Sequence, residues 1–260
     1  MSGSLTPRER ITAAIRAANS RGEPALIAYL TAGHPSRERF TEHVRALAAA
    51  AEVVEIGVPF TDPMADGVTI QRSSERALQQ GVTLRWILSA LCAMPPVEAP
   101  LILMSYLNPL LALGYERLAH EALEARVCGL IVPDLPYDES SPLRAALAER
   151  GLALVQMVTP VTAPERLRQV TAASEGFVYA VTMTGTTGRN VEIPAAALEY
   201  LDRVRAVTPL PVCAGFGIRS PGQIARLRGH VDGVVIGSAL VELLERGEDA
   251  SAWLAGLRAR

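Results

Sequence analysis

Residues 53–67 read VVEIGVPFTDPMADG and join a short apolar run to a loop of prolines and aspartates. The first half, residues 53–58, favours a buried strand because β-branched side chains pack well on a pleated surface. The second half holds two prolines, two aspartates and a glycine, so it cannot continue a sheet or begin a long helix. The stretch therefore predicts a buried strand that opens into a stiff acidic loop.

One carboxylate, Glu55, interrupts the apolar run. A carboxylate in a buried strand is costly to desolvate unless it is paired, protonated or open to a cavity. Glu55 is therefore either a satisfied structural charge, for example the partner of a buried arginine, or a working acid. Period-two alternation places Val53, Glu55 and Gly57 on the same face of the strand.

Strand and helix signals alternate on both sides of this stretch. The expected strands are residues 25–31, 53–58, 101–106, 127–132, 153–158, 177–182, 211–214 and 232–236. The expected helices are residues 5–19, a segment from 36 through 47, and residues 71–80, 84–92, 115–125, 141–150, 164–173, 195–207, 218–227, 239–245 and 250–257. Eight strands alternating with helices, with no long linker, predict a single (β/α)8 barrel (TIM barrel) domain over residues 1–260, with a short extra helix at the N-terminus. A doubly wound open sheet is the alternative.

Composition narrows the class of protein. The chain has 260 residues, of which 49% are hydrophobic, so it can bury a large core. A net charge of -2 without a basic cluster argues against a nucleic-acid surface. No secretion signal and no apolar run of ~20 residues is present, so no membrane contact is predicted and a cytoplasmic location is expected.

Several kinds of chemistry are disfavoured by residue type. Cys92, Cys128 and Cys213 are far apart in apolar surroundings and are expected to be buried free thiols. The four histidines show no paired spacing, so no metal site is expected. Lysine does not occur in the chain, which excludes a Schiff base through a side-chain amine and a pyridoxal linkage.

Glycine-bearing turns follow the last three expected strands. These turns are Thr184-Gly185-Thr186-Thr187-Gly188, Gly215-Phe216-Gly217-Ile218 and Gly237-Ser238. Each turn precedes helical sequence, so backbone N–H groups can point at an anion, and barrels frequently hold a phosphate at the last two of these loops. The pattern indicates a phosphate site rather than turns needed only for chain reversal.

A phosphate held there would place the reactive part of a ligand over the barrel mouth, within reach of Glu55 and the 61–67 loop. Without a metal or a lysine, the reaction would be run by protonation and deprotonation. A buried glutamate with a raised pKa suits that role.

The segment from Glu55 to Gly67 closely resembles the signature of the tryptophan synthase alpha chain family. Supporting matches are Tyr29-Leu30-Thr31-Ala32-Gly33, Met104-Ser105-Tyr106-Leu107-Asn108-Pro109, Pro133-Asp134-Leu135-Pro136 and the first two glycine turns above. The resemblance implies a carbon–carbon lyase of tryptophan biosynthesis, which cleaves indole-3-glycerol phosphate to indole and glyceraldehyde 3-phosphate without a cofactor.

The resemblance also implies roles for particular residues. Glu55 looks like the acid/base that protonates indole C3 and takes the proton from the glycerol hydroxyl, and Asp66 looks like the group that binds the indole N–H. The residues similar to the family's substrate pocket are Tyr29, Ile70, Tyr179, Thr187 and Phe216. The residues similar to its phosphate cradle are Gly188, Gly217, Gly237 and Ser238.

Three positions depart from the usual pattern. Val68 stands where proline is common, so the loop loses a fixed φ angle at its exit. Met64 replaces a usual leucine, which nearly conserves volume. Tyr29 stands where phenylalanine is common, so its hydroxyl needs a partner or water.

The resemblance further implies a pyridoxal-phosphate beta chain as partner in an alpha-beta-beta-alpha tetramer, with Pro63 and Asn108 at the contact surface. Exposed loop residues of this kind can equally be turn formers. The alternatives are a free-standing indole-3-glycerol phosphate lyase, a non-catalytic subunit that activates a beta chain, and an unrelated phosphate-sugar isomerase on the same barrel.

Overall fold

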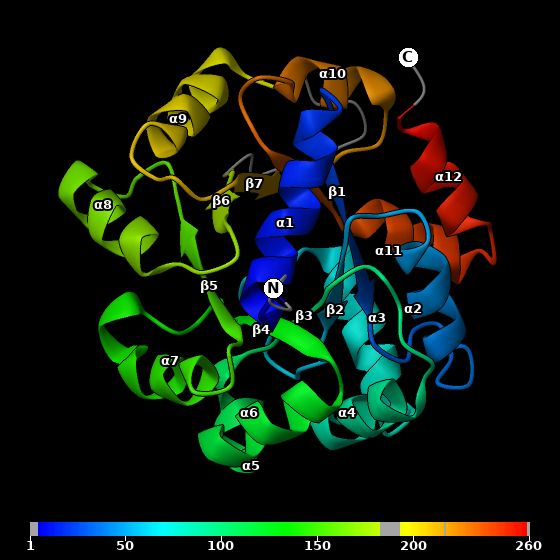
Figure 1. Ribbon diagram of the computed structural model, residues 1–260. Helices are drawn as coiled ribbons and strands as arrows, with labels where there is room; N and C mark the ends of the chain where they lie inside the picture. The colour runs from blue at the N-terminus through cyan, green and yellow to red at the C-terminus, as the bar shows by residue number, and fades with distance from the viewer. Residues whose placement is uncertain (1–4, 183–192, 216, 259–260) are drawn as a thin grey trace.

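The computed structural model describes residues 5–182, 193–215 and 217–258. Its eight strands are parallel and pair in chain order, and the last strand pairs with the first, so the sheet closes into a barrel (Figure 1). The predicted (β/α)8 barrel is confirmed, and the open doubly wound sheet is wrong. The strands are β1 (Ala25–Thr31), β2 (Val53–Gly57), β3 (Leu101–Met104), β4 (Val127–Ile131), β5 (Ala153–Val158), β6 (Val178–Val181), β7 (Val212–Gly215) and β8 (Gly233–Ile236).

Helices surround the barrel. They are α1 (Pro7–Ser20), α2 (Phe40–Ala48), α3 (Val68–Gln79), α4 (Leu84–Ala93), α5 (Leu107–Leu113), α6 (Tyr115–Glu124), α7 (Ser141–Ala148), α8 (Pro164–Ala173), α9 (Ala195–Arg205), α10 (Pro221–Leu227), α11 (Ser238–Glu245) and α12 (Ala250–Gly256), with a short 3-10 helix η1 (Tyr137–Glu139). None of the helices in the described part of the chain is long and apolar enough to cross a membrane.

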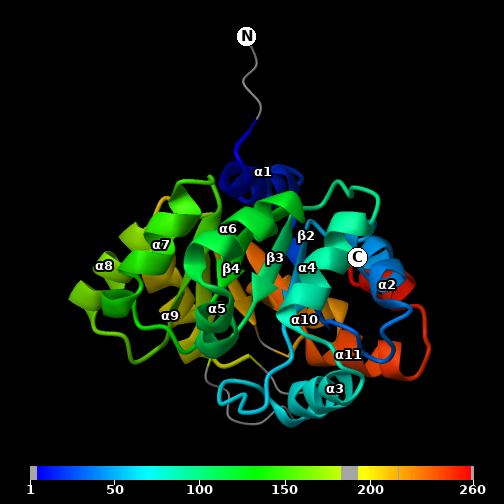
Figure 2. The same ribbon diagram turned by 90° about the horizontal axis from the view of Figure 1, so that it is seen from below.

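Alternate residues along each strand separate two apolar layers. On β2, Val54 and Ile56 pack outward with the surrounding helices, whereas Val53 belongs to the cluster inside the barrel. Ile11 and Ile15 of α1 join that inner cluster, so α1 closes the amino-terminal end of the barrel. Figure 2 shows α1 at one end of the molecule and α3 at the other. Glu55 therefore faces the interior, on the side toward the end that α1 leaves open.

Most boundaries agree with the sequence to within about three residues; the start of α2 does not, and the chain after β3 also differs from the prediction. α2 begins at Phe40 rather than at residue 36, because Arg37 is held outside it by its Nη1, which donates to Gln80 O (2.9 Å), and by its stacking over Trp86. β3 ends at Met104 rather than at residue 106, and the chain then enters α5, which the sequence did not predict. The backbone N–H of Leu107 donates to Asp134 Oδ1 (2.9 Å), which anchors the start of that helix.

The cysteines are free, as expected, and Cys128 and Cys213 are buried. Cys92 is exposed, so its expected burial is wrong. It lies on α4, whose buried positions are Leu84, Ile87, Leu88 and Leu91, and helical spacing turns Cys92 away from that face.

Candidate active site

A cavity of about 290 Å³ opens at the carboxyl-terminal ends of the strands. It brings together eight of the residues singled out from the sequence: Tyr29, Glu55, Asp66, Ile70, Tyr179, Gly217, Gly237 and Ser238. Thr187, Gly188 and Phe216 lie outside the described residues. Segments from both halves of the chain thus meet at one concave site, at the end of the barrel where such folds place their chemistry.

Glu55 lies at the floor of this cavity. Its side chain faces inward from β2, the residue is only 1% exposed, and its Oε2 has no hydrogen-bond partner in the described part of the chain. Burial, and to a lesser extent the charge of Asp66, raises the pKa of Glu55 to about 8. Glu55 therefore carries a proton at neutral pH, and no arginine of the described residues forms an ion pair with it. The working acid is the interpretation that this geometry supports.

Asp66 is presented by a loop that is fastened on two sides. Its carbonyl oxygen accepts a hydrogen bond from Gln71 Nε2 (2.8 Å), and the backbone N–H of Ala65 donates to the Tyr106 hydroxyl oxygen (2.9 Å). Tyr106 also stacks on Phe60 with ring centroids 5.1 Å apart. These contacts fix the half-buried Asp66 at the cavity's edge.

The two carboxyl groups have different protonation states. Burial raises the pKa of Asp66 to about 6, with a hydrogen bond from the Tyr106 hydroxyl acting in the opposite direction. At neutral pH Asp66 is thus mostly ionised while Glu55 is mostly protonated. Two neighbouring groups whose pKa values are separated by their surroundings are suited to act as an acid and an anionic stabiliser.

Two glycines make room for the tyrosine rings of the cavity. A Cβ atom at Gly57 would clash with the Tyr29 hydroxyl oxygen, and one at Gly215 would lie 3.0 Å from that of Tyr179. Because Gly57 and Gly215 carry no side chain, both rings can lie over the barrel mouth. The Tyr29 hydroxyl, which was expected from the sequence to need a partner, forms a hydrogen bond with Thr31 Oγ1 (3.3 Å).

The glycine turns form the other end of the cavity. Gly217 has a φ of +61°, a conformation that side chains rarely adopt, and Gly237 immediately precedes α11. A Cβ at Gly237 would lie 3.5 Å from Ile70 and 3.6 Å from Tyr29. The amino terminus of α11 and the apolar wall are therefore neighbours, so a ligand with an anion at one end can also reach the ring pocket.

Sequence reasoning missed part of the lining. The additional residues are Ala65, Gly67, Val68, Thr69, Met104, Met157, Val181, Arg219, Val235 and Glu242; Gly215, which also lines the cavity, belongs to a glycine turn already expected there. Alternation along the strands could have found Met157 and Val235, which face inward near strand ends. No local signal distinguishes Arg219 or Glu242 from surface charges, because their placement depends on the folded barrel.

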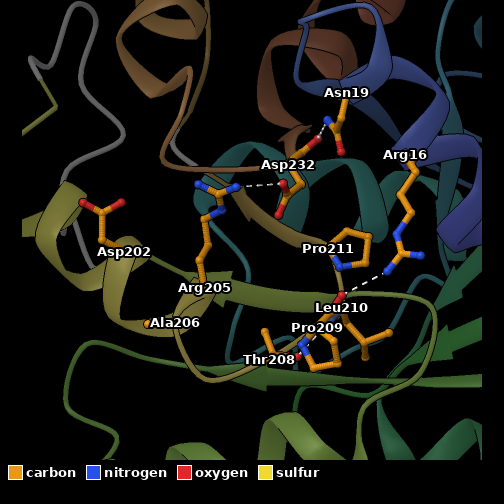
Figure 3. A pocket seen from close by; sticks show the side chains of 10 residues that line it. All are labelled: Arg16, Asn19, Asp202, Arg205, Ala206, Thr208, Pro209, Leu210, Pro211 and Asp232. Carbon is orange, nitrogen blue, oxygen red and sulfur yellow. Dashed lines mark hydrogen bonds and ion pairs between the residues drawn. The ribbon is translucent and has the colours of Figure 1, made fainter.

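A second cavity, of about 400 Å³, lies at the opposite end beside α1 (Figure 3). Its charged side chains are used in structural contacts: Arg16 donates to Pro209 O (3.0 Å) and Arg205 pairs with Asp232 (3.3 Å). Asn19 also donates to Asp232 O (2.7 Å). These contacts join α1 to the starts of β7 and β8, and they are remote from Glu55.

No cluster of three or more His, Cys, Asp or Glu side chains that could hold a metal ion occurs among residues 5–182, 193–215 and 217–258. The polar groups that line the candidate site are the carboxyls of Glu55, Asp66 and Glu242, the guanidinium of Arg219, the hydroxyls of the tyrosines, Thr69 and Ser238, and the backbone of the glycine turns.

Comparison with known proteins gives one consistent result. The sequence model of the family described as "Tryptophan synthase alpha chain" matches residues 15–257. The alpha chain of Nitratidesulfovibrio vulgaris (strain DP4) is 45% identical over 247 residues, which cover 94% of this chain and 96% of the relative.

Solved structures of tryptophan synthases also resemble this chain in fold and sequence. The tryptophan synthase of Mycobacterium tuberculosis in space group F222 superposes with a TM-score of 0.88 at 37% identity, covering 95% of this chain and 96% of that one. The alpha subunit from Legionella pneumophila strain Paris gives a TM-score of 0.87 at 30% identity, with 98% of both chains covered.

Proposed function

Since the chain belongs to the tryptophan synthase alpha chain family, we propose that Glu55 and Asp66 perform its reaction, the retro-aldol cleavage of indole-3-glycerol phosphate to indole and glyceraldehyde 3-phosphate. This is the alpha reaction of L-tryptophan biosynthesis, and it makes the chain a carbon–carbon lyase. The observation that carries the residue assignment is the buried, unpartnered Oε2 of Glu55, which faces the same cavity as Asp66 and the glycine turns.

The proposed steps balance by proton transfer alone. Protonated Glu55 gives its proton to C3 of the indole ring, which leaves a cation whose N–H is bound by the Asp66 carboxylate. The Glu55 carboxylate then takes the proton from the hydroxyl on the glycerol carbon attached to C3. As that carbon becomes an aldehyde, the C–C bond breaks and its electrons return to the ring, so indole leaves and Glu55 is protonated again.

Protonation at C3 makes the ring an electron sink. In amine-based aldolases a lysine Schiff base has this role, and this chain contains no lysine. An anion beside the ring nitrogen stabilises the charge that develops there, and it does so strongly because the site is partly closed to water.

Substrate contacts are proposed for the rest of the cavity. Tyr29, Ile70 and Tyr179 line the ring pocket, while Gly217, Gly237 and Ser238 supply backbone N–H groups to the phosphate, and both groups lie in the wall of one cavity. Thr187 and Phe216 as further substrate contacts, and Gly188 as part of the phosphate cradle, are proposed on the family resemblance alone.

Changing Gly217 to Val should mainly weaken substrate binding. The left-handed φ of Gly217 disfavours any side chain. Apart from its chain neighbours, no atom of the described residues lies within 4 Å of the position that a Cβ would take, so the new group would enter the cavity at the phosphate end. We expect KM for indole-3-glycerol phosphate to rise about tenfold, which is the effect of losing about 1.4 kcal/mol of binding, with little change in kcat. Gly222→Val, in α10, is the control. An unchanged KM in Gly217→Val would mean that the phosphate does not bind at Gly217.

The pH dependence of kcat/KM should be bell-shaped. Activity is expected to rise as pH passes about 6, where Asp66 becomes ionised, and to fall as it passes about 8, where Glu55 loses the proton that it donates. The profile of kcat/KM reports groups of the free enzyme, so it can be compared directly with these values. If kcat/KM continued to rise at pH values above the pKa of Glu55, the result would contradict the role of Glu55 as the acid that protonates C3.

Family membership implies a beta-chain partner, and we propose the alpha-beta-beta-alpha tetramer as the assembly, with Pro63 and Asn108 at the contact. In support, Met64 and Leu111 expose large apolar side chains, 85% and 52% accessible, on the same two segments. We also propose that residues 1–260 form one domain and that the enzyme works in the cytoplasm.

Indole release by the purified chain, with and without a beta chain, tests the proposed function. We expect measurable release by the chain alone and faster release with the beta chain. Release that is unchanged by a beta chain would indicate a free-standing lyase. Absence of release in both cases would contradict the proposed function.

A further inference from the structure

Two charged side chains in the wall of the active-site cavity have no role in the mechanism above. Arg219 lies two residues after Gly217, in the loop between β7 and α10, and Glu242 lies one helical turn after Ser238 on α11. Both line the same cavity as Gly217, Gly237 and Ser238. They therefore lie at the end of the cavity assigned to the phosphate.

The two side chains form a fork-to-fork ion pair. Arg219 Nη1 donates to Glu242 Oε2 (2.9 Å) and Nη2 donates to Oε1 (3.0 Å). The Thr69 hydroxyl donates to the same carboxylate (3.3 Å), and the backbone N–H of Arg219 donates to Gln223 Oε1 (2.8 Å). Arg219 is thus held both at its backbone and at its guanidinium. Its side chain therefore loses less conformational freedom when the guanidinium binds a further acceptor.

The Arg219–Glu242 pair determines the net charge next to the proposed phosphate position. The pKa of Glu242 is lowered by its hydrogen bonds and by the charge of Arg219, so its carboxylate is ionised at neutral pH. Residues four apart on a helix are neighbours, which brings this anion near Ser238 and the amino terminus of α11. Alone it would repel a phosphate dianion. Arg219 neutralises it, and of the five N–H donors of a guanidinium it directs two to Glu242.

We propose that Arg219 is a phosphate-binding residue of this chain: its guanidinium, held in place by Glu242, donates a hydrogen bond to the phosphomonoester of the bound substrate. The proposal rests on the proposed function, which places the phosphate at the glycine turns. It adds a charged side-chain contact to a cradle otherwise built from backbone N–H groups and Ser238, and it favours doubly charged ligands over uncharged analogues.

The test measures two ligands on the full chain by calorimetry: glycerol 3-phosphate, which carries the anion, and indole, which does not. In Arg219→Ala we expect the Kd for glycerol 3-phosphate to rise at least about tenfold, as for the loss of a hydrogen bond to a charged group, and the Kd for indole to stay unchanged. KM for indole-3-glycerol phosphate should rise with little change in kcat. Arg219→Lys, which keeps the charge, should recover part of the affinity.

Glu242→Gln is informative in combination with Arg219→Ala. Part of the loss in Arg219→Ala comes from repulsion by an unpaired Glu242, so the double variant should bind glycerol 3-phosphate more tightly than Arg219→Ala alone. Arg39→Ala removes the same charge from an exposed pair at the start of α2 (Arg39–Glu42, 2.7 Å) and is the matched control.

The outcomes separate this inference from the proposed function. Equal weakening of both ligands in Arg219→Ala would make the pair a structural clamp, and unchanged binding of both would leave Arg219 without a role in binding; either result overturns the inference. A wild-type chain that binds glycerol 3-phosphate but does not release indole would instead contradict the proposed function.

Discussion

Replacing Glu55 with Gln should lower kcat for indole release by several orders of magnitude while the substrate still binds. General acid–base transfer contributes roughly 10²–10⁴ to a rate, and Glu55 is assigned two transfers, one to C3 and one from the glycerol hydroxyl. Glutamine has nearly the same shape, so the ring pocket of Tyr29 and Tyr179 should remain intact. Steady-state kinetics together with substrate binding measured by calorimetry separates the loss of chemistry from a loss of affinity.

Glu52→Gln is a matched control for this variant. Glu52 precedes the same strand but lies at the opposite end of the barrel, where Arg258 Nη2 donates to its Oε2 (2.7 Å). The control makes the same chemical change without touching the cavity, so its kcat should be close to that of the wild type. Full activity in Glu55→Gln would end the assignment of Glu55 as the acid.

Replacing Asp66 with Asn should be the second most damaging change. We expect kcat to fall roughly 10²–10³-fold, the range seen when one group that stabilises transition-state charge is removed. Asn can still accept a hydrogen bond from the indole N–H, so the loss would measure the negative charge that faces the ring cation. Kinetics of indole release with the purified variant measures this effect.

The neighbouring Asp62 offers the control. Asp62→Asn makes the identical substitution in the same loop, but Asp62 is exposed and its carboxylate accepts a hydrogen bond from the Thr61 hydroxyl (2.5 Å). It does not line the cavity. Equal losses in the two variants would mean that the loop needs its overall charge rather than a carboxylate at position 66.

Local sequence was sufficient to predict most of the barrel. β5 and α8 begin and end where the sequence predicts, because a mainly apolar run of strand length and a proline at the first helical position are strong signals. The alternation Val53, Glu55, Gly57 was also enough to turn Glu55 inward, since a strand has only two faces.

The missing features depend on contacts between distant segments. The sequence did not predict α5, whose first turn contains Pro109 at a position where proline is tolerated. Tyr106 reaches the Asp66 loop across 41 residues, and Arg219 meets Glu242 across 23. No periodicity in the sequence encodes such pairs, and they became visible only once the barrel was closed.

The protonation state of Glu55 tests the central claim most directly. Difference infrared spectroscopy between the wild type and Glu55→Gln isolates the carboxyl band of this residue, which can be followed against pH in the absence of substrate. We predict a protonated carboxyl that ionises near pH 8 because the group is buried beside Asp66. Ionisation near the ordinary value of 4.5 would contradict the account, because Glu55 would then hold no proton to give to the indole ring at neutral pH.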